Sequence, residues 1–502
     1  MLTRNVFANL IGGVWVAILT LAIAPIQVHL LGVEAFGVIG FISTLQVVVG
    51  ILDLGLSSTL TREIAGDRTP GRQASRDLVR TSVTIYWSLA VLSGAAIVLL
   101  AVPLAHRWFN PDTIDIDTLE RALQVGAIYL AARWPVVLYT GVICGAQRMD
   151  VLNAVKIGAV TVRLAGGIVV LLLSPQLTSF LWWLGISSLI EVAAYLAAAR
   201  RVMPEADWRP GLSMDALRRV WGFSLQMAAL ALLSMLLTQV DRLMISRMLP
   251  LKELGYYSLA YTAATGISLV ISSISTALMP SFAAAHEAGE RGPLLARYEA
   301  ANRAMLFSTG VVLFSLGFFG RPLLSVWVSP SAATGAWVPL ALLAGGFWFS
   351  AAVSNAYTTS IALRRPSGPL LISLASAVLY VPLMYVMTRN WGTDGAAGAW
   401  LALNAFYLVT IVPFVHRKIL RIPVAPWLLT NVIPFAMLGL VTFGLARGLL
   451  ALWAPSAGLA SELMTLVAAA AAYSLLGYTL LGETLKSGVH HFLRGRRLSL
   501  SP

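Results

Sequence analysis

The chain has 502 residues, of which 58% are hydrophobic and 11% are charged, and its formal net charge is +13. A soluble protein carries about 25% charged residues, so this chain has too few charges to cover a water-facing surface. The composition excludes a soluble enzyme, a nucleic-acid-binding protein and a disulfide scaffold. The single cysteine, Cys144, has no partner for a disulfide or a metal site.

Apolar runs long enough to cross a bilayer, about 20 residues each, recur along the whole chain. The first contains Ala22-Ile23-Ala24, which has the form of a signal-peptide cleavage site. Because Pro25 follows and the run continues to Leu31, we interpret it as a retained helix. The predicted fold class is an all-α polytopic membrane protein with about 14 spans, at 8–31, 36–59, 82–105, 122–143, 155–173, 180–199, 220–240, 254–279, 304–326, 337–361, 370–388, 395–415, 428–450 and 462–481.

The basic residues predict the orientation of these spans. Most of the 35 Lys and Arg residues fall in one set of loops and at both termini, whereas the alternate loops collect acids such as Asp112, Asp115 and Glu120. Cytoplasmic loops are enriched in Lys and Arg. We therefore expect a multi-pass membrane protein with both termini in the cytoplasm.

The chain divides into two predicted lobes. The stretch 200–219, with Pro204, Pro210 and Gly211, reads as a cytoplasmic linker between six-helix lobes at 1–199 and 220–415. An additional helix pair at 428–481 and a basic cytoplasmic tail at 482–502 follow. The segments Leu31–Gly37 and Leu249–Gly255 echo each other at corresponding places in the two lobes, which favours parallel repeats.

Several short motifs resemble those of the O-antigen-type polysaccharide flippases, which belong to the multidrug/oligosaccharidyl-lipid/polysaccharide exporter superfamily. The resemblance covers about the first 300 residues and beyond them rests mainly on the number of spans. The motifs are Asn9-Leu10-Ile11-Gly12-Gly13, Leu30-Leu31-Gly32-Val33-Glu34-Ala35-Phe36-Gly37, Asp53-Leu54-Gly55-Leu56, Arg62-Glu63, and Gln239-Val240-Asp241-Arg242 followed by Gly255-Tyr256-Tyr257.

This resemblance implies a transporter rather than an enzyme, with two six-helix lobes around a central cavity that opens to either side in turn. The implied cargo is an undecaprenyl-diphosphate-linked oligosaccharide, an O-antigen or exopolysaccharide repeat unit, moved from the cytoplasmic to the periplasmic leaflet. No cofactor is implied, and H+ or Na+ remains open as a coupling ion. The expected partners are this substrate, membrane lipids and polysaccharide polymerase or chain-length machinery, with the chain itself a monomer.

Charged residues inside the spans are the first candidates for substrate binding. A sugar hydroxyl costs about 4–8 kcal/mol to move into hydrocarbon without a partner, so a flippase needs polar side chains at membrane depth and cations for the diphosphate. Charges within spans are costly and usually face the protein interior or water. The candidates are Arg133, Arg163, Glu191 and Asp53. We expect Arg163 to pair with Glu191, leaving Arg133 freer as an anion ligand; the alternative is that all four form structural ion pairs.

Further candidates lie in the first and seventh spans and in a cytoplasmic loop. The side-chain amides of Asn9 and Gln27 either line a path for the sugars or form hydrogen bonds between helices. Asp241 and Arg242 either shape the external mouth and bind a coupling ion or form an interfacial salt bridge. Four arginines at four-residue spacing either collect anionic headgroups or only set the topology: Arg68, Arg72, Arg76 and Arg80.

Two other function classes remain as alternatives. The same fold serves cation-coupled exporters of drugs or metabolites, but the extra spans at 428–481 and the basic first lobe argue against that cargo. A membrane-embedded polysaccharide polymerase or ligase would need a sizeable outer loop with Arg and His, whereas the outer segments here are short. A Walker-type glycine loop is absent from the sequence.

Overall fold

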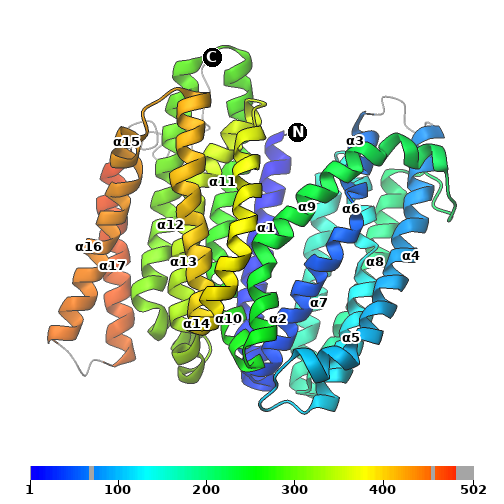
Figure 1. Ribbon diagram of the computed structural model, residues 1–502, viewed down its shortest axis with the longest axis horizontal. Helices are drawn as coiled ribbons and strands as arrows, with labels where there is room; N and C mark the ends of the chain where they lie inside the picture. Colours follow the sequence, from blue (N-terminus) through cyan, green and yellow to red (C-terminus); the bar gives the residue numbers. More distant parts are fainter. Residues whose placement is uncertain (1, 67–72, 454–457, 482–502) are drawn as a thin grey trace. The chain divides into compact units, whose positions relative to one another are not determined.

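The computed structural model describes residues 2–66, 73–453 and 458–481, and every regular element among them is a helix (Figure 1). Thirteen helical stretches in this described part are long and apolar enough to span a membrane. One of them, Ser367–Leu420, is 54 residues long and contains two of the predicted spans, 370–388 and 395–415. The prediction of an all-α polytopic membrane protein is confirmed. The predicted tail at 482–502 lies outside the described residues.

Packing divides the chain into two compact units, Met1–Leu259 and Ala260–Pro502. The stretch predicted as a linker, 200–219, covers the end of α8 (Leu177–Val202), an irregular segment at 203–213 and the beginning of α9 (Met214–Met248). All of it lies inside the first unit, so it does not separate the two units. The elements of this unit are α1 Leu2–Leu31, α2 Val33–Gly50, the 3-10 turn η1 Ile51–Asp53, α3 Leu56–Gly66, α4 Gln73–Pro103, the π turn η2 Leu104–Trp108, α5 Ile116–Arg133, α6 Val136–Gly145, α7 Met149–Leu173, α8 Leu177–Val202, α9 Met214–Met248 and the beginning of α10 Leu251–Ala264.

Two predicted spans of the first unit are broken helices. The span at 36–59 is interrupted at Leu54 and Gly55, whose φ values of 48° and 72° are left-handed and end the α2–η1 segment before α3 begins. The span at 122–143 is divided at Pro135, between α5 and α6. Proline has no amide hydrogen to donate, so a helix bends there. Both breaks lie beside polar side chains of the candidate site.

A buried acid joins α2 to the segment between η2 and α5. Glu34, only 4% exposed, accepts hydrogen bonds from the backbone N–H groups of Asp112 (2.6 Å), Thr113 (2.7 Å) and Ile114 (3.0 Å) and from the Thr113 hydroxyl. These backbone donors have no helical partner, so the carboxylate satisfies groups that would otherwise be left unpaired.

The two echoing segments meet through their glycines. A Cβ atom added to Gly37 would lie 2.8 Å from the Leu251 carbonyl oxygen and 2.9 Å from the Gly255 nitrogen, and one added to Gly255 would overlap the Val33 carbonyl oxygen. The backbones of α2 and α10 therefore approach closely at this point, as small residues allow between membrane helices.

The second unit consists of long helices that pack side by side, with α16 and α17 lying against α12 (Figure 1). Its elements are α11 Gly266–Glu287, α12 Arg291–Trp327, α13 Pro330–Ala362, α14 Ser367–Phe414, the π turn η3 Val415–Leu420, α15 Val424–Trp427, the π turn η4 Leu428–Val432, α16 Ile433–Trp453 and α17 Leu459–Leu480. Non-helical angles at Trp391 and Gly392 mark the kink between the two spans that form α14.

Aromatic side chains fill the contact between the last two helices and α12. The rings of Phe307 and Tyr473 stack with centroids 5.8 Å apart, and Phe314 lies 6.0 Å from Phe443. Arg447 of α16 and Glu462 of α17 form an ion pair of 2.6 Å. The helix pair predicted at 428–481 is therefore an integral part of the second unit.

Candidate functional site

Three of the four charged candidates meet in one cluster inside the first unit, which we call the charge triad. Glu191 of α8 contacts Arg133 at the end of α5 (Nε to Oε2, 3.2 Å) and Arg163 of α7 (Nη1 to Oε2, 2.6 Å). The Glu191 side chain is 4% exposed, that of Arg163 13% and that of Arg133 22%. Two guanidinium groups share one carboxylate, so the triad carries one net positive charge at membrane depth.

The predicted pair between Arg163 and Glu191 is present, and Arg133, predicted to be the freer anion ligand, contacts the same carboxylate. Both α5 and α7 pack against α8, and Glu191 points between them, so it reaches both arginines. The two arginines nevertheless differ. Arg133 is the more exposed of the two, and Trp183 donates a hydrogen bond of 2.9 Å to the backbone carbonyl of Arg163.

A cavity of about 70 Å³ opens beside Arg133. Its polar lining consists of Gln46, Asp53 and Arg133, and its apolar lining comes from α2, α5 and α6. Tyr129 donates a hydrogen bond of 3.3 Å to Gln46. A space of this size and polarity suits a few water molecules and is too small for an oligosaccharide headgroup. Arg133 therefore touches a polar cavity as well as its acidic partner.

Asp53 lines the same cavity without joining the triad. Its carboxylate accepts hydrogen bonds from the Ser57 backbone N–H (3.3 Å), the Ser57 hydroxyl (2.8 Å) and the Tyr86 hydroxyl. Asp53 thus caps the first turn of α3, the role for which Asp is favoured at a helix start. The Asp53-Leu54-Gly55 sequence before Ser57 is a turn-and-cap signal that could have predicted the helix break. Tyr86 was missed because it lies on another helix, α4. Gln46 lies in the same predicted span as Asp53 but was not singled out from the sequence.

The amide candidates of the first span do not lie in the described cavity. Gln27 is buried on α1 and is not among the residues that line it. Asn9 lies on the same helix, and its side chain is outside the described part of the structure. The role of both amides remains a prediction.

Asp241 and Arg242 form a separate polar site on α9. Asp241 is buried and accepts hydrogen bonds from the Tyr257 hydroxyl (2.7 Å) and from the Arg242 backbone N–H (2.8 Å). The Arg242 guanidinium donates to Gln239 at 3.4 Å. Tyr257 comes from α10, so Asp241 ties two consecutive helices together, a contact that spacing along the sequence could not show.

The predicted arginine stripe is described only in part. Arg68 and Arg72 lie outside the described residues, while Arg76 and Arg80 are exposed on the first turns of α4. Arg80 lies 4.0 Å from Asp207 and packs against Gly211, both in the segment between α8 and α9. Arg80 therefore has a structural contact, and capture of headgroups by this stripe remains a prediction.

Comparison with known proteins agrees with this fold. Residues 2–286 match the family described as polysaccharide biosynthesis protein. A putative O-antigen transporter of Shigella flexneri is 21% identical over 373 residues, which cover 74% of this chain and 87% of that protein.

Two solved structures share the fold at low sequence identity. The lipid II flippase MurJ, in an inward closed conformation, superposes with a TM-score of 0.73 at 11% identity and covers 96% of this chain and 99% of that one. The MATE multidrug transporter DinF-BH, solved in a ligand complex, superposes with a TM-score of 0.61 at 14% identity, covering 83% and 95%. These matches show that the chain shares the fold of those two proteins. The family match spans more than half of the chain, which therefore belongs to the polysaccharide biosynthesis protein family.

Proposed function

We propose that this protein is a flippase of the bacterial inner membrane that moves an undecaprenyl-diphosphate-linked oligosaccharide from the cytoplasmic to the periplasmic leaflet by alternating access. The family match and the likeness to an O-antigen transporter support a polysaccharide cargo. The observation that carries the proposal is the net positive charge triad of Arg133, Glu191 and Arg163. Its function is to provide a cationic ligand for the diphosphate inside the membrane.

The shared carboxylate makes this cluster suited to transient binding. Arginine presents several N–H donors in a planar fork. Arg133 uses its Nε toward Glu191 and also lines the cavity. A diphosphate that approaches Arg133 adds charge-assisted hydrogen bonds, while Glu191 keeps its bond to Arg163. When the diphosphate leaves, Arg133 returns to Glu191. The Arg133 guanidinium is therefore never buried without an anionic partner.

The membrane potential favours export of this cargo. Moving one negative charge outward across a membrane that is negative inside is favourable by about 2.3 kcal/mol per 100 mV. The proposal extends to coupling by H+ or Na+ through Asp241, a buried carboxylate that accepts hydrogen bonds from the Tyr257 hydroxyl and a backbone N–H. Transport in the absence of an ion gradient would remove this part of the proposal and leave the flippase itself untouched.

The test of the diphosphate site replaces Arg133 with Ala and, separately, with Lys. Hydrogen bonds to charged groups contribute about 1.5–3 kcal/mol each, so we expect Arg133→Ala to reduce surface polysaccharide by about tenfold or more. Arg133→Lys keeps the charge without the planar fork and should lie between this variant and the wild type. In Arg133→Ala, lipid-linked repeat units should accumulate in the cytoplasmic leaflet. A defect in a polymerase or ligase would not cause accumulation in that leaflet.

Arg447→Ala serves as the matched control, because Arg447 is also an intramembrane arginine paired with one glutamate but lies in the second unit. It should leave export unchanged. Normal surface polysaccharide in Arg133→Ala, at wild-type protein levels in the membrane, would show that Arg133 does not bind the diphosphate.

A further inference from the structure

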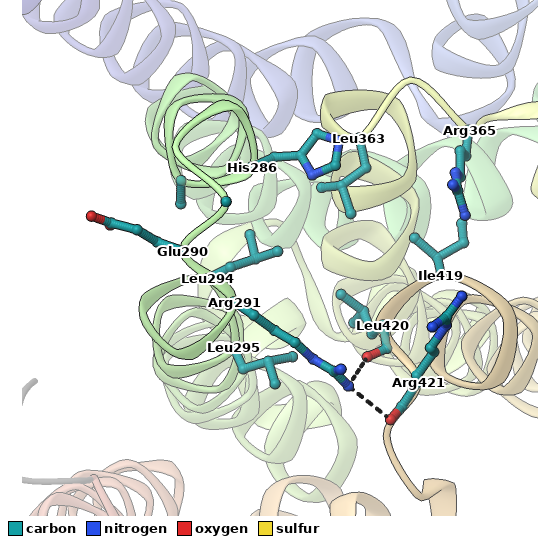
Figure 2. Close-up of a pocket in the computed structure, with 12 residues that line it drawn as sticks. His286, Glu290, Arg291, Leu294, Leu295, Leu363, Arg365, Ile419, Leu420 and Arg421 are labelled. Atoms are coloured by element: carbon teal, nitrogen blue, oxygen red, sulfur yellow. Dashed lines mark hydrogen bonds between the residues drawn. The ribbon is translucent and has the colours of Figure 1, made fainter.

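The second unit contains a pocket of about 260 Å³ at one end of its helix bundle, which we call the loop pocket (Figure 2). Its walls come from the turn between α11 and α12, the turn between α13 and α14, and the segment that joins η3 to α15. All three connections belong to the basic set that the positive-inside rule assigns to the cytoplasm. The pocket therefore lies where the bundle meets the cytoplasmic surface of the membrane.

Three arginines, one from each connection, line the loop pocket: Arg291, Arg365 and Arg421. Arg291 is held in place, because its Nη2 donates to the backbone carbonyls of Leu420 (3.1 Å) and Arg421 (3.2 Å). Figure 2 shows Arg365 and Arg421 on the same side of the pocket. In the described part of the chain, neither of these two guanidinium groups has a hydrogen-bond or ion-pair partner.

The acids near the pocket do not neutralise these arginines. Glu290 belongs to the lining, but its side chain points away from Arg365 and Arg421 (Figure 2). Glu287 is bonded to Arg364 at 3.3 Å, and Arg364 is not part of the lining. His286 is the remaining titratable group in the wall. The pocket is thus cationic and complementary to an anion.

The rest of the wall is apolar and sets the kind of anion that fits. The apolar part of the lining includes Leu294, Leu295, Leu363, Ile419 and Leu420. Pockets that enclose drug-sized ligands measure about 300–1,000 Å³, so this one suits a single phosphate-bearing group with a short apolar extension. Arginine matches the geometry of phosphate oxygens with paired N–H donors.

We propose that the loop pocket binds a phosphate group, carried either on an anionic phospholipid of the cytoplasmic leaflet or on a soluble phosphate compound. A phosphate between Arg365 and Arg421 links the α13–α14 turn to the η3–α15 segment, and Arg291 already joins that segment to α12. The ligand therefore fastens three helix connections together. This site lies in the second unit and is independent of the charge triad and of the transported substrate.

The experiment measures ligand binding to the purified full-length protein by native mass spectrometry and by the shift of its thermal unfolding temperature. The probes are phosphatidylglycerol, zwitterionic phosphatidylcholine and inorganic phosphate. Phosphatidylglycerol should bind about tenfold more tightly than phosphatidylcholine if the source is a lipid. Stabilisation by inorganic phosphate without preference for phosphatidylglycerol would identify a soluble compound as the source. No binding of any anionic probe would overturn the proposal.

The double variant Arg365→Gln/Arg421→Gln should lose about tenfold or more of this affinity. Arg421 has φ of 54° in the wild type, and glutamine keeps a similar unbranched side chain there. Arg364→Gln is the matched control, because it removes an adjacent exposed arginine outside the pocket and should bind as the wild type does. An equal loss of affinity in the control and in the double variant would mean that the anion is attracted to the basic surface in general. That result would refute a specific site in the loop pocket. Since binding is read directly, the result does not depend on transport.

Discussion

At the scale of single residues, Glu191 decides the electrostatics of the first unit. It is the acid that both Arg133 and Arg163 contact, and it is almost fully buried. Breaking a buried ion pair leaves an uncompensated charge, which costs far more than the pair contributes as a net gain. Glu191 is therefore a structural residue as well as the counterion of the proposed diphosphate site.

Replacing Glu191 with Gln should destabilise the protein strongly. Two guanidinium groups would then face each other without an acid, and loss of one partner of a buried pair costs about 3–5 kcal/mol. Thermal unfolding of the purified variant in detergent should show a clearly lowered midpoint. The double variant Glu191→Gln/Arg163→Gln removes one of the two cations and should recover part of the loss.

Glu462→Gln provides the comparison for this prediction. Its partner Arg447 is 40% exposed, so the pair is better solvated and its loss should cost about 1 kcal/mol or less. A midpoint for Glu191→Gln as high as that of Glu462→Gln would contradict the role assigned to the triad.

At the scale of elements, the break between α2 and α3 places Asp53 at the cavity. Gly55 has φ of 72°, a conformation open to glycine and strained for other residues. Gly55 also packs directly against α9, since a Cβ atom added to Gly55 would lie 2.6 Å from the Ser224 carbonyl oxygen. A hydrogen bond of 2.8 Å between Thr59 and Ser224 joins the same two helices. The break and the packing of α9 therefore depend on one residue.

Gly55→Ala should lower the stability of the protein by about 1–3 kcal/mol, because overpacking of a tight contact adds to the backbone strain. Thermal unfolding checks this. Gly50→Ala is the matched control five residues earlier: Gly50 has helical φ and ψ of −52° and −24°, and an added Cβ would have no neighbour within 4 Å. Gly50→Ala should be neutral or slightly stabilising. Equal behaviour of the two alanine variants would show that α9 does not press on Gly55.

At the scale of the whole molecule, the uneven distribution of basic residues predicts the orientation in the membrane. Single-cysteine variants test it, since Cys144 is the only native cysteine. In a Cys144→Ser background, Asp117→Cys should react with a membrane-impermeant thiol reagent added outside spheroplasts. Arg209→Cys should react only after the membrane is opened. Both positions are exposed. The opposite pattern would invert the orientation and the direction proposed for transport.

The sequence alone was enough to predict the membrane spans and to identify the charged residues within them that need a polar or ionic partner. Apolar length is a local property, so the presence of the spans was predictable, including the two that are merged in α14. Helix ends were less predictable, since α12 begins at Arg291 rather than at 304. The cost of a charge in lipid is also local, which is why Arg133, Arg163, Glu191 and Asp53 stood out. The pairing of Arg163 with Glu191 was predicted because the two residues lie at similar depth in consecutive spans.

Which partner each charge finds was decided only by the tertiary structure. Contact between α5 and α8 gives Glu191 a second arginine, and α4 brings Tyr86 to Asp53. From the sequence, Glu34 was named only as part of a motif. In the structure its carboxylate accepts hydrogen bonds from the backbone N–H groups of Asp112–Ile114. The three arginines of the loop pocket come from connections more than 50 residues apart. Hydropathy shows whether a segment lies in lipid or in water. A salt bridge between helices depends on how the helices are rotated and how they cross, and both are set by side-chain packing along the entire helix.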